Sequence, residues 1–421
     1  MPRIRRPRAA RKDPAGENPA GQEKARPRGD RGWLLRLVIS FSCAQAAVSM
    51  ARPAVSYRAL ALGADERAVG VIAGVYALLP LFVAVPLGRR TDHGRCAPLL
   101  LLGVALIAGG CALGGTSGSL GALAAWSGVM GLGHLCFVIG AQSIVARRSA
   151  PAERDRNFGH FTIGASLGQL VGPLAAGALI GGDTGGTSAL ALVVAAGVAA
   201  VSCTSLWRLE QPRCGAGASA GGASAAPEAD ASAGPGVSVL RILGARGVPA
   251  GMFISLAVLS ATDILTAYLP VIGEDRGIAP ATVGILLGLR AGATIACRLV
   301  MTPLIRLLGR RALIAGTCAA AGLLCAGVAL PLPVWALGAV LTLLGFCLGV
   351  GQPLSMTTVV QAAPAGARST ALALRLTGNR LGQVAAPAGA GLIAGVAGAA
   401  APFVTLGVLL CVAAGAAGRA A

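Results

Sequence analysis

Long apolar stretches recur along the chain, with short polar interruptions between them. A helix needs about 20 mostly apolar residues to cross a bilayer. Stretches of that kind predict helices over residues 33–57, 67–88, 96–115, 119–146, 157–181, 187–207, 248–272, 280–303, 311–330, 332–360, 369–393 and 396–417. A polar stretch rich in Gly, Ala and Ser follows the sixth of them, which is typical of a linker. The pattern predicts an all-α membrane protein with twelve transmembrane helices, six on each side of the linker.

The fifth predicted helix of each half carries the same residues at a constant offset of 214 positions. The matching pairs are Gly164 and Gly378, Leu167 and Leu381, Gly168 and Gly382, Gln169 and Gln383, Pro173 and Pro387, and Gly177 and Gly391. Internal repeats of this kind are typical of secondary transporters. We therefore expect two pseudo-symmetric halves at 33–208 and 248–421, a cytoplasmic linker at 209–247 and a disordered basic tail at 1–32.

Basic residues are distributed unevenly between the two sets of connections. Connections from odd to even helices hold three arginines, Arg58, Arg67 and Arg276, whereas those from even to odd helices hold fifteen. Eleven of the 35 Lys and Arg residues also lie in residues 1–36. Cytoplasmic loops carry an excess of Lys and Arg, so we expect a multi-pass protein of the cell membrane with both termini cytoplasmic. This role explains the basic tail without a nucleic-acid partner.

The overall composition agrees with a bilayer environment. Hydrophobic residues make up 55% of the 421 positions and charged residues 12%, whereas a soluble domain has about 25% charged residues. The eleven cysteines form no CxxC pair, and most lie in apolar runs, so we expect neither disulfides nor a metal site. No P-loop, HExxH or GxSxG motif occurs in a suitable context. We expect no enzyme activity, no cofactor and no ATP-driven transport by this chain alone.

The loop after the second predicted helix contains Gly88, Asp92, His93, Gly94 and Arg95. This loop, the six-plus-six layout and the half-repeat resemble the major facilitator superfamily, whose signature loop reads G-x-x-x-D-R-x-G-R. Here one residue is missing between the acid and the second glycine, and His93 stands where the family has a basic residue. The resemblance implies a transporter that alternates between two states. It also implies a gating loop of Gly88, Asp92, Gly94 and Arg95, in which Asp92 holds the halves in one state.

The fifth predicted helix contains Gly164, Gly168, Gly172, Pro173 and Gly177. Glycines four residues apart form a smooth stripe for helix packing, and proline adds a bend. The pattern resembles a glycine–proline motif in the fifth span of the family's drug–proton antiporters, which favours efflux over uptake. Generic packing in a glycine-rich protein is the alternative. The family's exporters often have an arginine in span four, and this chain has none there, which puts the usual proton-coupling site in doubt.

Ionisable residues inside a bilayer cost several kcal/mol, so those within predicted helices are functional candidates. Of the 16 acidic residues, only Asp263 lies well inside a predicted span. It is interpreted either as the carrier of the coupling proton or as the permanent partner of an arginine, and Arg290 lies at a suitable depth for that pair. His134, the one histidine deep within a span, is either a second proton-coupling candidate, since imidazole titrates near neutral pH in water, or a hydrogen-bonded packing residue.

Arginine is in excess over acid within the predicted spans. The candidates for a substrate cavity are Arg52, Arg290, Arg375, Arg380, Gln45, Gln142 and Asn379. Arg298 also falls in a span, near its cytoplasmic end. Because guanidinium groups bind carboxylates and phosphates, this excess favours an anionic or zwitterionic solute. Tyr76 and the few other aromatic residues either line the path or contact lipid, and we favour lipid contact.

The leading interpretation is a monomeric secondary transporter that exports a small organic solute in exchange for protons, by alternating access. Its partners would be the solute, protons and the bilayer. An uptake symporter for an organic anion is one alternative, and a membrane sensor or scaffold that transports nothing is another. A flux measurement in vesicles with an imposed proton gradient would separate the three.

Overall fold

A computed structural model describes residues 32–93, 96–149, 153–181, 183–206, 239–245, 247–363 and 368–419. Within these ranges the chain forms fourteen helices and no strand. The predicted tail lies outside the described residues except for its last position, and so does most of the predicted linker. Two of the fourteen helices are short: α7 (Val239–Leu243) and α10 (Met301–Leu308).

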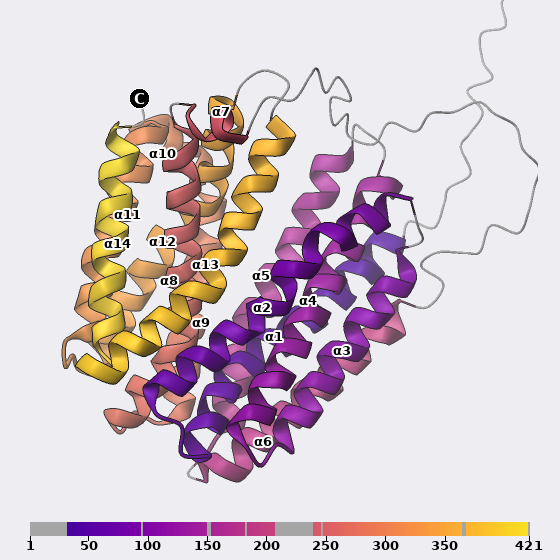
Figure 1. The fold of residues 1–421 in the computed structure, drawn as a ribbon, viewed down its shortest axis with the longest axis vertical. Helices are drawn as coiled ribbons and strands as arrows, with labels where there is room; N and C mark the ends of the chain where they lie inside the picture. Colours follow the sequence, from indigo (N-terminus) through magenta and orange to yellow (C-terminus); the bar gives the residue numbers. More distant parts are fainter. Residues whose placement is uncertain are drawn as a thin grey trace, which may run out of the picture.

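The other twelve helices coincide with the twelve predicted ones to within a few residues. The first six are α1 (Gly32–Ala61), α2 (Glu66–His93), α3 (Ala97–Gly115), α4 (Leu120–Arg148), α5 (Arg154–Leu179) and α6 (Thr184–Ser205). The last six are α8 (Val248–Asp275), α9 (Pro280–Leu299), α11 (Arg310–Ala329), α12 (Val334–Ala362), α13 (Arg368–Ala397) and α14 (Ala401–Arg419). They form two bundles side by side (Figure 1). The predicted all-α fold of twelve helices in two halves is confirmed.

Eleven of these described helices are long and apolar enough to cross a membrane. The twelfth, α13, is 30 residues long but contains Arg375, Asn379 and Arg380, which lower its apolarity. Arg375 and Asn379 are buried, with 6% and 7% of their surfaces exposed, and α13 packs between α2 and α8. Polar groups on a membrane helix are tolerated where they face protein instead of lipid, so α13 fits the bundle as a helix shielded from lipid on its polar side.

The half-repeat has a counterpart in helix packing. In the first half, Gly168 of α5 lies so close to α1 that a Cβ atom there would be 2.6 Å from the carbonyl oxygen of Ser42. In the second half, Gly382 of α13 faces Leu256 of α8, and both residues follow their counterparts by 214 positions. The neighbouring glycines of the α5 stripe, Gly164 and Gly172, also face α1. The stripe therefore packs α5 against α1 backbone to backbone.

One contact between the halves joins α2 to α13. A Cβ atom at Gly70 would lie 2.5 Å from the carbonyl oxygen of Pro387 and 2.7 Å from Cα of Gly391. Real side chains do not approach a neighbour so closely, because overpacking costs free energy. The two helices can therefore meet at this depth only because position 70 lacks a side chain.

The matching contact joins α5 to α9. A Cβ atom at Gly284 would lie 2.5 Å from the carbonyl oxygen of Pro173 and 2.8 Å from Cα of Gly177. Gly284 follows Gly70 by 214 positions, and Pro173 and Gly177 precede Pro387 and Gly391 by the same 214 positions. The two halves are thus joined by two equivalent glycine contacts, which we call the paired glycine seams.

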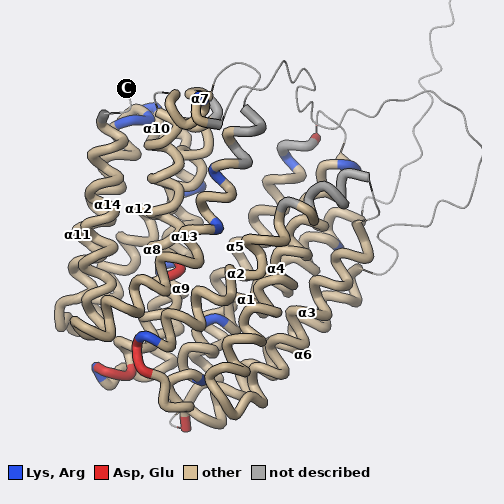
Figure 2. Tube along the Cα trace, in the orientation of Figure 1, with Lys and Arg blue, Asp and Glu red and all other residues tan. Residues whose placement is uncertain are grey.

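The bundles converge toward one end of the molecule and diverge toward the end that holds α7, α10 and the C-terminus (Figure 1). Both glycine seams lie toward the convergent end, because Gly70 and Gly284 fall within the first turns of α2 and α9, which begin there. Lys and Arg occur at both ends and within the bundles, whereas most of the acidic residues gather at the convergent end (Figure 2). Basic residues are typical of the cytoplasmic side, so the predicted orientation would make this an inward-facing arrangement.

Candidate functional site

An ion pair joins the two halves inside the helical bundle. Arg52 of α1 and Asp263 of α8 lie with Nη2 and Oδ1 2.7 Å apart, and 21% and 5% of their side-chain surfaces are exposed. Arg52 lies nine residues before the end of α1, which corresponds to about 14 Å along the helix axis. A charge at this depth is tolerated when it has a partner of opposite sign. The two opposite charges therefore compensate each other inside the bundle.

The expectation that Asp263 pairs with Arg290 is wrong. Sequence proximity favoured that pair because Arg290 lies on the next predicted span, whereas α8 packs against α1 across the boundary between the halves. The carboxylate accordingly meets Arg52, more than two hundred positions away in the sequence. Among the described residues, Arg290 forms neither a hydrogen bond nor an ion pair through its guanidinium.

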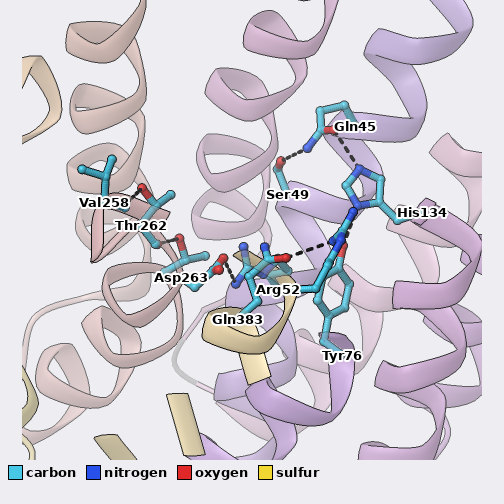
Figure 3. A network of polar contacts seen from close by, with 11 residues as sticks. Gln45, Ser49, Arg52, Tyr76, His134, Val258, Thr262, Asp263 and Gln383 are labelled. Carbon is cyan, nitrogen blue, oxygen red and sulfur yellow. Dashed lines mark hydrogen bonds and ion pairs between the residues drawn. The ribbon is translucent and has the colours of Figure 1, made fainter. Parts of the chain in front are cut away.

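The second carboxylate oxygen of Asp263 is left unsatisfied. Oδ2 is buried and has no hydrogen-bond partner among the described residues. The nearby hydroxyl groups do not serve it, because Thr262 donates to the carbonyl oxygen of Val258 at 3.2 Å and Thr266 to that of Thr262 at 2.8 Å. These contacts are drawn in part in Figure 3. A buried acceptor without a partner costs about 1–3 kcal/mol, so this oxygen can receive a proton or a ligand donor.

A second polar group extends through the first half from Tyr76 of α2 to Ser49 of α1 (Figure 3). The Tyr76 hydroxyl lies 2.7 Å from Nδ1 of His134, and Nε2 of His134 lies 3.0 Å from Oε1 of Gln45. The Gln45 amide donates to the Ser49 hydroxyl at 3.2 Å. Because Oε1 only accepts, Nε2 carries the proton and Nδ1 accepts from Tyr76. A neutral imidazole satisfies both contacts.

Tyr76 connects this group with the ion pair. The Arg52 guanidinium carbon lies 5.3 Å from the centre of the Tyr76 ring, in cation–π geometry. Only 8% of Tyr76 is exposed, so the favoured expectation that it contacts lipid is wrong. Arg52 and Tyr76 also line a small cavity with Ser56, Ser127 and Ala267. Four helices, α1, α2, α4 and α8, thus contribute to one connected site.

Two further arginines lie near the ion pair. Arg290, of which 9% is exposed, is close enough to interact electrostatically with both Arg52 and Asp263. Arg380 of α13 interacts in the same way with Asp263 and Tyr76, and its Nη1 donates to Oε1 of Gln383 at 3.0 Å. The structure therefore gathers three arginines around one carboxylate at the boundary between the halves.

Three of the predicted cavity residues, Asn379, Arg375 and Gln142, make no hydrogen bond with the ion pair in the described part of the chain. Asn379 is buried beside Arg380, and its Oδ1 has no partner among the described residues. Arg375 donates to α12, at 2.8 Å to Oε1 of Gln352 and at 3.3 Å to Ser355, which holds two helices of the second half together. Gln142 is exposed on α4. The contacts of Arg375 with Gln352 and Ser355 indicate a packing role for this arginine.

The predicted gating loop can be placed only in part. Gly88 and Asp92 belong to the last turns of α2, and their side chains lie outside what the structure describes. Gly94 and Arg95 fall between α2 and α3, also outside the described residues. The role of this loop stays a prediction.

The offset of 214 also relates positions of the candidate site that the sequence patterns did not connect. Tyr76 and Arg290 correspond to each other, and their carbonyl oxygens approach Gly131 and Gly345, which correspond as well. Extending the repeat from the fifth helices to the second ones would have identified Tyr76 as a residue of the site.

Comparisons with known proteins address the identity of the chain. A curated relative, the efflux pump azaK of Aspergillus niger, is 28% identical over 122 residues, which are 28% of this chain and 26% of that pump. The match thus spans about a quarter of the relative's length.

Solved structures match over nearly the whole chain. A bacterial homologue of the human lysosomal transporter Spinster, inward-facing and occupied, has a TM-score of 0.73 at 14% identity, covering 93% of this chain and 97% of that one. A POT family transporter in complex with a thioalcohol-conjugated peptide has a TM-score of 0.71 at 15% identity, covering 91% and 94%. The nucleoside transporter NupG has a TM-score of 0.68 at 15% identity, covering 91% and 98%. At these identities the likeness shows a common fold.

The family assignment comes from the sequence profile of the Major Facilitator Superfamily, which matches residues 37–340 and 251–419. Together these ranges cover both bundles, the ion pair between them and the two glycine seams. The chain belongs to the Major Facilitator Superfamily of membrane transporters.

Proposed function

We propose that this transporter moves a small organic solute out of the cell in exchange for protons. The halves at 33–208 and 248–421 would rock about the paired glycine seams, with the linker at 209–247 on the cytoplasmic side. The protein would act as a monomer in the cell membrane, with both termini cytoplasmic. The uneven distribution of arginine between the two sets of connections supports that orientation.

The observation that carries proton coupling is the ion pair between the halves. Arg52 and Asp263 are held together in the arrangement whose convergent end is closed. A proton on Asp263 would remove the negative charge and leave Arg52 without its partner, which weakens this contact between the halves. The buried and unpartnered Oδ2 of Asp263 offers the proton a place to bind. Protonation would thus favour separation of the halves at the convergent end.

His134 supports this assignment by contrast. Both of its ring nitrogens are already used, by Tyr76 and by Gln45. A second proton would turn Nδ1 from an acceptor into a donor, so Tyr76 would have to accept and its own hydroxyl hydrogen would lose its present acceptor. We therefore assign coupling to Asp263 and a positioning role to His134.

Export is favoured by the partial likeness to an efflux pump and by the glycine–proline pattern in α5. Within the described part of the chain, Arg290, Arg375 and Arg380 have no carboxylate within ion-pair distance, which favours an anionic or zwitterionic solute. Uptake of an organic anion by symport is the competing function, and the direction of the coupled proton movement separates the two.

Flux in proteoliposomes tests the proposal. Vesicles with an imposed proton gradient would be assayed for solute-dependent proton movement with a panel of anionic, zwitterionic and cationic solutes. Asp263→Asn should abolish coupled movement, whereas Glu153→Gln, which removes an exposed carboxylate paired with Arg156, should leave it unchanged. Coupled movement at a normal rate in Asp263→Asn would exclude Asp263 as the proton carrier.

A further inference from the structure

We propose that Arg290 and Arg380, beside the Arg52–Asp263 pair, form a binding site for a solute that carries two negative charges. This inference rests on the proposed transport function and names the substrate class of the same site. The chemistry is that of a dianion, whether its charges sit on two carboxylates or on one phosphate group. Three features of the structure carry it: an unpartnered arginine, a charge imbalance and a broken internal symmetry.

Arg290 is a buried cation without a partner among the residues that the structure describes. Nine per cent of the residue is exposed, and its Nε is buried with no hydrogen bond. Its carbonyl oxygen lies against Gly345, so the backbone of α9 is held tightly to α12 there. Burying an unpaired guanidinium is costly, and a protein retains such a group where a ligand supplies the missing acceptors.

Internal symmetry explains why the protein itself supplies no acceptor. Arg290 corresponds to Tyr76, whose hydroxyl is satisfied by His134. The position that corresponds to His134 in the second half is Leu348, and the position that corresponds to Gln45 is Leu259. The second half therefore keeps the close backbone contact of Arg290 with Gly345, which matches that of Tyr76 with Gly131, but has leucine in place of both polar partners. Arg290 is left facing the boundary between the halves.

The local charge sum is positive. Arg52, Arg290 and Arg380 interact with Asp263 as the single described carboxylate of the group. His134 is neutral in its present hydrogen bonds, so the cluster holds two positive charges in excess. In a medium of low dielectric constant an excess charge is unfavourable, and a ligand of opposite charge is correspondingly favoured. Two negative charges on one solute neutralise the cluster, whereas a monoanion leaves one charge uncompensated.

Arg380 gives the site a second anchor. Its Nη1 donates to Gln383, a neutral partner that leaves the charge of the guanidinium uncompensated. Arg380 belongs to α13 and Arg290 to α9, and these are the two helices of the second half that form the glycine seams with the first half. A dianion held by both would be bound next to the contacts that must open and close. Substrate binding and movement of the halves would thereby be coupled.

The test is ligand binding by the purified full-length chain in detergent, followed as the shift in unfolding temperature. The probes are succinate, glycerol phosphate and sulfate as dianions, chloride as a monoanion, dimethyl succinate as a neutral ester and tetraethylammonium as a cation, at equal ionic strength. We expect the dianions to stabilise the protein more than the other probes. Arg290→Gln should lower affinity for dianions about tenfold or more, which corresponds to the loss of one charged contact.

Two further variants guard against misfolding and general salt effects. Arg290→Lys retains the charge and should keep the preference for dianions over chloride. Arg311→Gln removes an exposed arginine at the start of α11 and should bind as the unaltered protein does. Equal stabilisation of unaltered protein and Arg290→Gln by every dianion would overturn the proposal, as would stronger protection by tetraethylammonium.

The outcome also separates this inference from the proposed function. Dianion binding that depends on Arg290, without flux in proteoliposomes, would retain the site and refute transport. Flux of another solute, without any preference for dianions, would retain transport and refute the dianion site.

Discussion

The two halves use equivalent positions differently. In the first half, α5 packs on α1 through glycine, and the buried polar groups of Gln45, His134 and Tyr76 satisfy one another. In the second half, α13 packs on α8 across the side chain of Leu256, and Arg290 has no hydrogen-bond or ion-pair partner within the described residues. The repeat thus preserves the glycine seams between the halves, where backbone meets backbone, whereas the packing within each half differs. The polar positions have diverged, and under the proposed function this difference gives the second half its binding residues.

The glycine seams are where the halves are most alike, and altering them should have the largest effect. Gly70→Ala and Gly284→Ala each place a Cβ atom 2.5 Å from a carbonyl oxygen of the other half. Overpacking against backbone costs about 3 kcal/mol per site. We expect the double variant to populate the arrangement with the convergent end open. Cysteine labelling of residues at that end measures the shift.

Gly109→Ala and Gly197→Ala are matched controls, because a Cβ atom at either position meets nothing within 4 Å. Labelling in these variants should match that of the unaltered protein. Unchanged labelling in the seam double variant as well would show that the seams are not the contact that opens.

The ion pair is the clearest polar link between the halves. Asp263→Asn or Arg52→Gln alone should destabilise the protein by about 3–5 kcal/mol. Each variant removes one member of the ion pair and leaves the charge of the other member buried without a partner. Combining the two changes should recover part of the loss. A double-mutant cycle of unfolding free energies measures the coupling, and additive effects would indicate that the two side chains do not interact.

The contrast between His134 and Leu348 can be tested by making the first half resemble the second. His134→Leu leaves the Tyr76 hydroxyl and Oε1 of Gln45 without the partner that each has in His134, which should cost about 1–3 kcal/mol. Adding Tyr76→Phe removes one unsatisfied group and should restore part of the stability, as measured by thermal unfolding. If His134→Leu were as stable as the unaltered protein, the hydrogen-bonded chain would contribute nothing.

The smallest expected difference is between corresponding glycines within the halves. Gly168→Ala places its Cβ atom 2.6 Å from the backbone oxygen of Ser42, whereas Gly382→Ala meets the side chain of Leu256 at 2.7 Å. A leucine side chain can rotate away and backbone cannot. Gly168→Ala should therefore cost about 1–2 kcal/mol more than Gly382→Ala, as unfolding free energies would measure. Equal costs would contradict the difference in packing.

Much of the architecture could be predicted from the sequence because it depends on local patterns. Apolar stretches located twelve helices, and the repeat in the two fifth helices identified two halves, since each signal lies within one helix. Which arginine meets Asp263 could not be predicted in this way. The partner of Asp263 is set by the packing of α1 against α8. From the sequence, Arg290 is favoured instead, because it lies at a similar depth on the next span along the chain.

Composition and spacing were enough to indicate the membrane setting, the pseudo-symmetry and the candidate residues of the site. Which of those residues meet is visible only in the folded protein. It places Arg52 against Asp263, satisfies His134 from both sides and leaves Arg290 buried without a partner in the described part of the chain. The physical reason is that these contacts form between helices far apart in the sequence, and their geometry is set by how closely glycine lets those helices approach.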